Sequence, residues 1–214
     1  AQSTNDKVLA MNRRGHTRED IFRSARLLKE RGFELGLQMM TGLYGSNDED
    51  SIGTARDIIS LSPDTARIYP TVVIENTELA ELYRNGEYRP QTPEEAAVLC
   101  AKILPMFERA GIKVIRLGLH SGGDVEGSFV AGAYHPALRE MCEGHIYFDI
   151  INRALSGKEK GKYIIYVAPR EVSKASGQRR CNIEKLRELG YECRIKENAA
   201  LSARDITLEK VNLL

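Results

Sequence analysis

Three glycines in this chain, Gly32, Gly111 and Gly190, each stand between an apolar helical pattern and an apolar strand pattern. A glycine at this place is typical of a helix end, because it adopts the left-handed backbone conformation at no steric cost. Strands that alternate with helices favour a parallel sheet, since parallel strands need a crossover connection. The pattern therefore predicts an α/β protein. Because a closed barrel of this kind has about eight such units, the chain forms either an open sheet or part of a barrel.

Helix and strand signals fill in this outline. Capping signatures precede three predicted helices, and Pro105 should kink or shorten the third of them. The capping pairs are Thr17 with Asp20, Ser46 with Glu49, and Thr92 with Glu95. Predicted strands cover residues 33–40, 66–73, 112–118, 163–167, 191–195 and 206–211, and a further helix covers residues 182–189.

The character of the sequence changes after residue 120. A glycine-rich stretch over residues 121–135 is typical of a connecting loop, so we expect two domains at residues 1–122 and 123–214. The second contains a basic segment, residues 153–196, with 12 Lys or Arg against 5 Asp or Glu. Such a surplus permits contact with a nucleic acid or an anionic substrate, and a solvated surface is the simpler interpretation.

No apolar run in the 214 residues approaches the roughly 20 needed to cross a bilayer, and the first residues carry no signal-peptide pattern. We therefore expect a cytoplasmic protein without a membrane segment. The cysteines are too few and too scattered to predict a disulfide framework, so buried thiols are the favoured interpretation. They are Cys100, Cys142, Cys181 and Cys193.

Chemistry-bearing residues stand where predicted strands end, which is where ligands collect in parallel α/β folds. Gln2 is at one such end, and the pair Arg13 and Arg14 follows in a loop. A guanidinium binds a carboxylate through two parallel hydrogen bonds, so an arginine here suits an anionic ligand. A solvent-facing arginine pair before a helix is the alternative interpretation.

Alternation along a later strand places Arg116, Gly118 and His120 on one face, opposite Ile115. These residues contact a substrate if that face looks into a barrel, whereas Arg116 is a surface ion-pair partner if it looks outward. Tyr69, at the end of the preceding strand, is either a pocket residue or a core tyrosine with a satisfied hydroxyl.

Three histidines, His120, His135 and His145, invite comparison with a metal site. Their spacing differs from the close helical spacing of zinc ligands, and no Cys or acidic residue is placed to complete a site. We therefore expect no metal on these residues.

The ordered series from Ala1 to about His120 resembles the second half of a radical S-adenosylmethionine barrel. It is most similar to oxygen-independent coproporphyrinogen oxidases and to the catalytic subunit of Elongator. Those families carry a Cys-x3-Cys-x2-Cys motif near their first strand, and this sequence contains none. The resemblance implies the second half of a parallel (β/α) partial TIM-type barrel, plus a small C-terminal α/β region, as a fragment of an enzyme.

The resemblance also implies roles for single residues. Gln2 would face S-adenosylmethionine, and Arg14 would pair with the carboxylate of that cofactor, or Arg13 if the register slips by one. Gln38 stands where the families usually place an aspartate that binds the ribose hydroxyls; its neutral amide can still bond to a hydroxyl. The turn Gly42–Gly45 corresponds to a Gly-Leu-Pro-Gly turn of the families.

In the parent enzyme, an upstream four-iron four-sulfur cluster would donate an electron to S-adenosylmethionine, and the fragment alone would be inactive in that reaction. An Elongator-type acetyltransferase domain is not recognisable in the second region, which argues against transfer-RNA acetylation. The substrate, a small molecule or RNA, is not specified.

Two other functions stay open. One is a self-sufficient α/β enzyme that binds a phosphate at the loop 42–46 or the loop 122–127. The other is a noncatalytic RNA-binding module that uses the basic segment 153–196.

Overall fold

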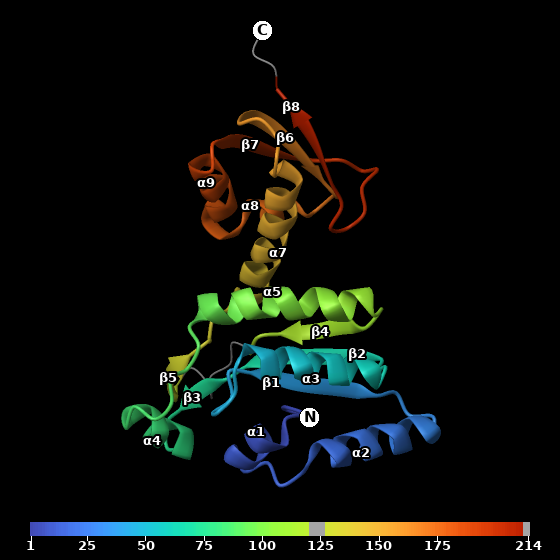
Figure 1. Cartoon of the computed structure of the whole chain (residues 1–214), viewed down its shortest axis with the longest axis vertical. Coiled ribbons are helices and arrows are strands. Elements are labelled where there is room, and N and C mark those ends of the chain that lie inside the picture. Colours follow the sequence, from blue (N-terminus) through green and yellow to red (C-terminus); the bar gives the residue numbers. More distant parts are fainter. Residues whose placement is uncertain (120–126, 212–214) are drawn as a thin grey trace. The chain divides into compact units, whose positions relative to one another are not determined.

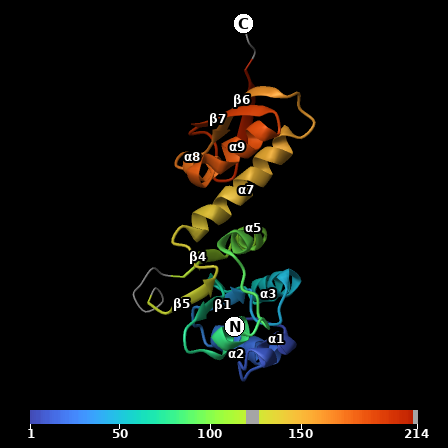
Figure 2. The same cartoon turned by 90° about the vertical axis from the view of Figure 1, so that its left-hand side faces the viewer.

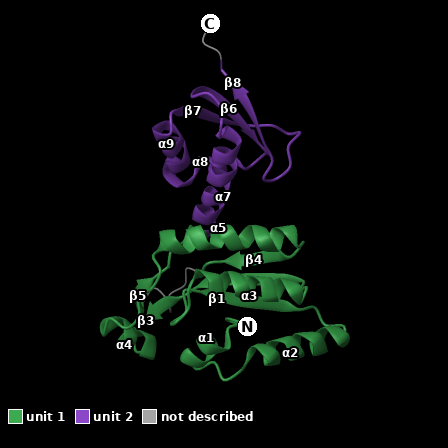
Figure 3. Ribbon diagram, in the orientation of Figure 1, with its two compact units in different colours: residues 1–138 green, residues 139–214 purple. Residues whose placement is uncertain are grey.

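The computed structural model describes residues 1–119 and 127–211 (Figure 1). The chain divides into two compact units, Ala1–Leu138 and Arg139–Leu214, which Figure 3 colours separately. The predicted domain boundary between residues 122 and 123 lies outside the described residues and stays a prediction. Residues 127–138, which follow it, belong to the first unit.

Unit 1 contains a parallel sheet with the strand order β1-β2-β4 and an antiparallel ribbon of β3 and β5. The parallel sheet confirms the predicted α/β class. Its strands and those of the ribbon are β1 (Gly36–Thr41), β2 (Thr65–Pro70), β3 (Val72–Ile74), β4 (Lys113–Leu117) and β5 (Phe129–Gly132). The helices are α1 (Asp6–Met11), α2 (Arg18–Glu30), α3 (Asp48–Ser60), α4 (Glu78–Arg84) and α5 (Pro93–Arg109).

The helices of unit 1 begin largely as the sequence predicts. Capping boxes start α2 and α5 at the expected residues. The prediction for α3 is wrong by one residue, because Asn47 and not Ser46 is its cap, and Asp50 closes the box. Ser46 instead donates a hydrogen bond from its hydroxyl to the carbonyl oxygen of Leu43 at 2.7 Å. Pro105 lies inside α5, which continues past it, so the helix is not shortened there.

The two faces of the parallel sheet differ in burial. One face is apolar and buried, and α3 and α5 both contact the strands that form it; Figure 1 shows these helices lengthwise and Figure 2 shows them after a turn of 90°. Its buried side chains are Leu37, Met39, Ala66, Ile68, Val114 and Leu117. Burying each of the larger ones stabilises the fold by about 1.5–3 kcal/mol. The opposite face carries the partly exposed side chains Gln38, Met40, Arg67, Tyr69 and Arg116.

A register shift changes the pairing of β2 with β4. Ala66 pairs with Val114 and Arg67 pairs with Arg116, so Ile115 is an extra residue in β4, as in a β-bulge. Ile115 has no partner in β2 and is 41% exposed. Because paired residues of a sheet point to the same side, the extra residue places Arg116 on the face that carries Arg67.

Unit 2 contains a three-stranded sheet with the order β7-β6-β8, in which β6 is parallel to β7 and antiparallel to β8. The predicted strands and helix of this region are all present, whereas the 18-residue helix α7 was not identified in the sequence. The elements are α7 (Leu138–Leu155), β6 (Gly161–Val167), α8 (Val172–Ser176), the short 3-10 helix Gln178–Arg180, α9 (Cys181–Glu188), β7 (Tyr191–Glu197) and β8 (Ile206–Lys210). Among the helices of the described chain, none is long and apolar enough to span a bilayer.

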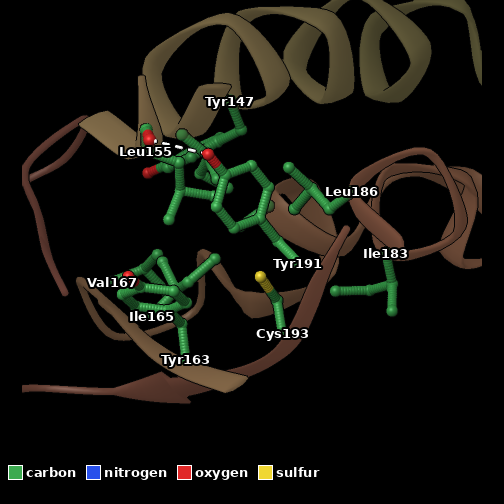
Figure 4. Packing of buried hydrophobic residues seen from close by; sticks show 11 residues of the cluster. Tyr147, Leu155, Tyr163, Ile165, Val167, Ile183, Leu186, Tyr191 and Cys193 are labelled. Atoms are coloured by element: carbon green, nitrogen blue, oxygen red, sulfur yellow. Dashed lines mark hydrogen bonds between the residues drawn. The ribbon is translucent and has the colours of Figure 1, made fainter. Parts of the chain in front are cut away.

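Buried tyrosines bind the layers of unit 2 together (Figure 4). Tyr191 on β7 donates a hydrogen bond from its hydroxyl to the carbonyl oxygen of Leu155 at 3.0 Å. Tyr147 on α7 donates to Glu171 Oε2 at 2.6 Å, and burial together with this carboxylate raises the pKa of Tyr147. The polar ends of both rings are therefore satisfied inside an apolar core.

The cysteines are all free thiols. Cys100, Cys142 and Cys193 are buried, as the sequence predicts, while Cys181 is partly exposed. Burial raises the pKa of Cys100 to about 12, so this thiol stays protonated and unreactive at neutral pH.

Candidate functional site

The first residues of the chain lie beside the end of β1. The amide of Met40 donates a hydrogen bond to the carbonyl oxygen of Gln2 at 2.8 Å, so this segment continues the edge of the sheet without being a strand. Its other side is anchored on α3 through the buried hydroxyl of Thr54. Thr4 donates its N–H to Thr54 Oγ1 at 3.1 Å, and Ser3 Oγ lies 3.4 Å from the same atom. These contacts fix where the side chain of Gln2 leaves the backbone.

The side chain of Gln2 has an unsatisfied acceptor. Its Oε1 atom is buried and has no hydrogen-bond partner within the described part of the chain. A buried acceptor left without a donor costs about 1–3 kcal/mol, so such a position is expected to be completed by a ligand or another group.

Arg13 and Arg14 have different surroundings. Arg13 adopts a left-handed conformation with φ of 49° and forms an ion pair with Glu78 at 2.7 Å. Arg14 points its Nη2 toward the sulfur of Met40, 3.8 Å away, and has no carboxylate partner in residues 1–119 or 127–211. A thioether is a weak acceptor, so the guanidinium of Arg14 keeps most of its hydrogen-bonding capacity. This geometry favours Arg14 over Arg13 as an anion ligand.

Gln38 and Tyr69 share the face on which Met40 lies. Gln38 is two residues before Met40 in β1, and Tyr69 pairs directly with Met40 in the ladder. The structure thus brings Gln2, Arg14, Gln38 and Tyr69 to one end and one face of the sheet. His120, the remaining predicted substrate residue beside Arg116, lies outside the described residues.

Arg67 is a residue that the sequence did not single out. It pairs with Gln38 on one side and with Arg116 on the other, so an amide and two guanidiniums form one row across three strands. No local pattern reveals this row, because it depends on the register shift at Ile115.

The loop after β1 is shaped by close packing. Gly42 has φ of 69°, and a Cβ atom there would lie 2.7 Å from Gln91 Oε1. Tyr88 donates from its hydroxyl to the carbonyl oxygen of Gly42 at 2.6 Å, and burial raises the pKa of Tyr88 to about 12. Glycine is favoured here because it adopts this backbone angle without strain and leaves room for the Gln91 side chain.

A cleft of about 680 Å³ opens beside this loop. Acidic side chains line much of it, among them Asp48, Glu87 and Glu94. The first turn of α3 is itself acidic, and its cap is already satisfied by Asn47. Negative charge at this helix start repels phosphate, so the alternative of a phosphate site at the loop 42–46 is unfavourable.

The described residues contain no group of three or more His, Cys, Asp or Glu side chains that could hold a metal ion. His135 has a structural contact instead, since its Nδ1 accepts a hydrogen bond from the N–H of Ala137 at 3.1 Å. This contact closes the turn before α7.

The basic segment 153–196 presents two arginines in unusual conformations. Arg179 and Arg180, with φ of 52° and 64°, are both left-handed and precede α9, which has no side-chain cap. Both are exposed. Other cations of the segment are engaged with rings, such as Lys160, whose Nζ lies 4.0 Å from the ring centre of Tyr191.

Comparison with known proteins connects these features to a family. Residues 63–147 match the Radical_SAM C-terminal domain. The chain is 35% identical over 114 residues to the tRNA uridine(34) acetyltransferase of Methanocaldococcus jannaschii, covering 50% of this chain and 21% of that protein. It is 32% identical over 114 residues to the human Elongator complex protein 3, covering 49% of this chain and 20% of that protein.

A solved structure is also similar. The archaeal Methanocaldococcus infernus Elp3 with an N-terminal deletion superposes with a TM-score of 0.56 at 26% identity, covering 69% of this chain and 39% of that chain. The chain spans about a fifth of the length of the curated relatives named above. The likeness to coproporphyrinogen oxidases stays a prediction. The sequence matches and the shared fold together show that the chain is similar to the C-terminal part of an Elongator-like protein of the radical S-adenosylmethionine superfamily.

Proposed function

We propose that Gln2, Arg14 and Gln38 form part of the S-adenosylmethionine site of an Elongator-like radical enzyme. The observation that carries the proposal is the pairing of an unsatisfied acceptor with an available cation. Gln2 Oε1 is buried without a partner, and Arg14 lies against Met40, the residue that bonds to the Gln2 backbone. A zwitterionic amino-acid group needs both kinds of partner.

Each of the three residues suits a different group of the cofactor. The planar guanidinium of Arg14 can donate two hydrogen bonds to the carboxylate of the methionyl part. Gln2 Oε1 can accept a hydrogen bond from the neighbouring ammonium group, and the amide of Gln38 can bond to a ribose hydroxyl. The residues therefore bind and orient the cofactor, and the chemistry it supplies when bound is a 5′-deoxyadenosyl radical that abstracts hydrogen.

The iron-sulfur cluster does not fit this chain in the same way. No Cys-x3-Cys-x2-Cys motif occurs in the sequence, and within the described ranges no cluster of metal-binding side chains exists. We assign the cluster to the parent protein.

Binding of S-adenosylhomocysteine tests the site, because it presents the same amino-acid and ribose groups without the redox reaction. In the protein that carries the complete barrel, Arg14→Ala should weaken binding by roughly 1.5–3 kcal/mol, the worth of hydrogen bonds to a charged group. Arg13→Ala is the matched control, since Arg13 is paired with Glu78 and should leave the affinity unchanged. Equal affinity of the Arg14→Ala and wild-type proteins in calorimetry would defeat the assignment.

A contact of the basic segment 153–196 with RNA is a second function that we propose. It is supported by the exposed Arg179 and Arg180, for which the described structure contains no acidic partner, and by the tRNA named in the description of the archaeal relative. Acetylation itself is not proposed for this chain, which spans only a fifth of that relative.

Salt dependence tests the RNA contact. Binding to transfer RNA should weaken steeply as salt is added, because each neutralised phosphate releases counterions. The double change Arg179→Glu with Arg180→Glu should remove this binding, whereas Arg23→Glu with Arg26→Glu on α2 serves as the control of equal charge. Loss of binding in both double variants alike would show a general charge effect and contradict the assignment.

A further inference from the structure

The row formed by Gln38, Arg67 and Arg116 contains two arginines that have no role in the cofactor site proposed above. Its two arginines are direct partners in the parallel ladder, so their Cα atoms lie about 4.8 Å apart on the same face of the sheet. The register shift creates this neighbourhood, because Ile115 would lie opposite Arg67 if the ladder continued without the shift. Bulges of this kind often re-aim a side chain next to a functional site.

Neither guanidinium has a counter-charge within residues 1–119 and 127–211. Arg67 and Arg116 form no ion pair or hydrogen bond with any acidic side chain in the parts of the chain that the structure describes. Elsewhere in unit 1, paired arginines are common: Arg13, Arg18, Arg23, Arg26, Arg84 and Arg89 all have carboxylate partners. The other described arginines of unit 1 that lack an ion pair are exposed, whereas Arg67 and Arg116 are partly buried.

Two like charges placed opposite each other destabilise a sheet, and partial burial reduces the screening that water provides. Within the described residues, the two guanidiniums therefore favour the binding of an anion. Gly36 leaves room for the guanidinium of Arg67 to lie along the sheet. A Cβ atom at Gly36 would lie 3.7 Å from Arg67 Nη1.

We propose that Arg67 and Arg116 bind a phosphate group of a ligand on the polar face of the β1-β2-β4 sheet. Two planar guanidiniums can each donate paired hydrogen bonds to phosphate oxygens, and phosphate supplies enough oxygens for both. The site is separate from Arg14, which lies by Met40, one position further along the face toward the strand ends. It stands whether or not S-adenosylmethionine binds beside it.

Nuclear magnetic resonance of the arginine Nε–H groups tests the site directly. Sodium pyrophosphate is titrated into the full chain at constant ionic strength, and the side-chain signals of Arg67 and Arg116 should shift together and saturate. Arg67→Gln and Arg116→Gln should each weaken this binding at least tenfold. Arg31→Gln is the control, because Arg31 is exposed, follows α2 and lies on no sheet. A titration with a dinucleotide then distinguishes two kinds of phosphate ligand. The dinucleotide offers only a phosphodiester, whereas pyrophosphate offers terminal phosphates.

The possible outcomes decide the proposal. Saturable shifts at both arginines that are lost in the Gln variants and kept in Arg31→Gln support it. Shifts that appear only at Arg179 and Arg180, or binding that survives in Arg67→Gln combined with Arg116→Gln, overturn it. If a Gln variant does not fold, the wild-type signals still give the answer, because unshifted Arg67 and Arg116 signals at saturating pyrophosphate exclude the site.

Discussion

Replacing Thr54 with valine should loosen the segment that carries Gln2. Thr54 is 1% exposed, and its hydroxyl oxygen accepts the hydrogen bond from the N–H of Thr4 at 3.1 Å. Valine has nearly the same shape but no hydroxyl, so the buried N–H of Thr4 loses its acceptor. An unsatisfied buried donor costs about 1–3 kcal/mol, and we expect the free energy of unfolding to fall by about 2 kcal/mol. At roughly 2–4 °C per kcal/mol, the melting temperature should fall by about 4–8 °C.

Urea unfolding followed by circular dichroism measures this loss, and hydrogen exchange locates it. The amide of Thr4 should exchange much faster in the Thr54→Val protein, because its hydrogen bond protects it in the native state. Thr54→Ser is the control: it keeps the hydroxyl and should keep the Thr4 amide protected, although loss of one methyl group costs about 0.5–1.5 kcal/mol. An unchanged urea midpoint together with unchanged Thr4 protection in Thr54→Val would refute the reasoning.

Two further predictions concern charge and burial. The hydrogen bond from Arg18 holds the pKa of Asp57 below its ordinary value of 3.8, so the stability that this carboxylate contributes is complete above that value and is lost as the pH falls through the lower, folded-state pKa. The urea midpoint of Arg18→Gln should therefore decrease less steeply than that of the wild type as the pH falls below 3.8, and parallel curves would contradict this assignment. Tyr147→Phe should cost about 1–2 kcal/mol in urea unfolding, because the hydroxyl bonds to the buried Glu171 at 2.6 Å. Tyr166→Phe, which removes an exposed bond of the same kind, should have a much smaller effect, and equal losses would argue against burial as the cause.

The helix and strand order could be predicted because its signals are local. Gly32, Gly111 and Gly190 all have the left-handed backbone that their place after a helical pattern suggests, with φ of 77°, 72° and 89°. Caps such as Thr17 depend on residues three positions away, so they too appear in the sequence. Local rules failed by one residue at α3, where Asn47 competes with Ser46 for the same role.

The candidate site was less visible because its decisive contacts join distant residues. The preference for Arg14 over Arg13 follows from the ion pair of Arg13 with Glu78, which no local pattern indicates. The ribbon of β3 and β5 pairs strands of only a few residues from distant segments, too short for a clear alternation. Arg67 was missed as a site residue for a similar reason. Its neighbour Arg116 is determined by the register in which β2 and β4 pair.

The register shift in β4 has a consequence for how this protein can evolve. A substitution at Arg116 changes one side chain, but pairing of β4 with β2 without the shift would place Ile115 opposite Arg67 and turn Arg116 to the other face, while leaving both arginines in the gene. Relatives that pair this strand without the shift would therefore share the same arginines without sharing the face on which they meet. A sequence alignment hides that difference, so homologues should be compared here by strand register and not by residue identity.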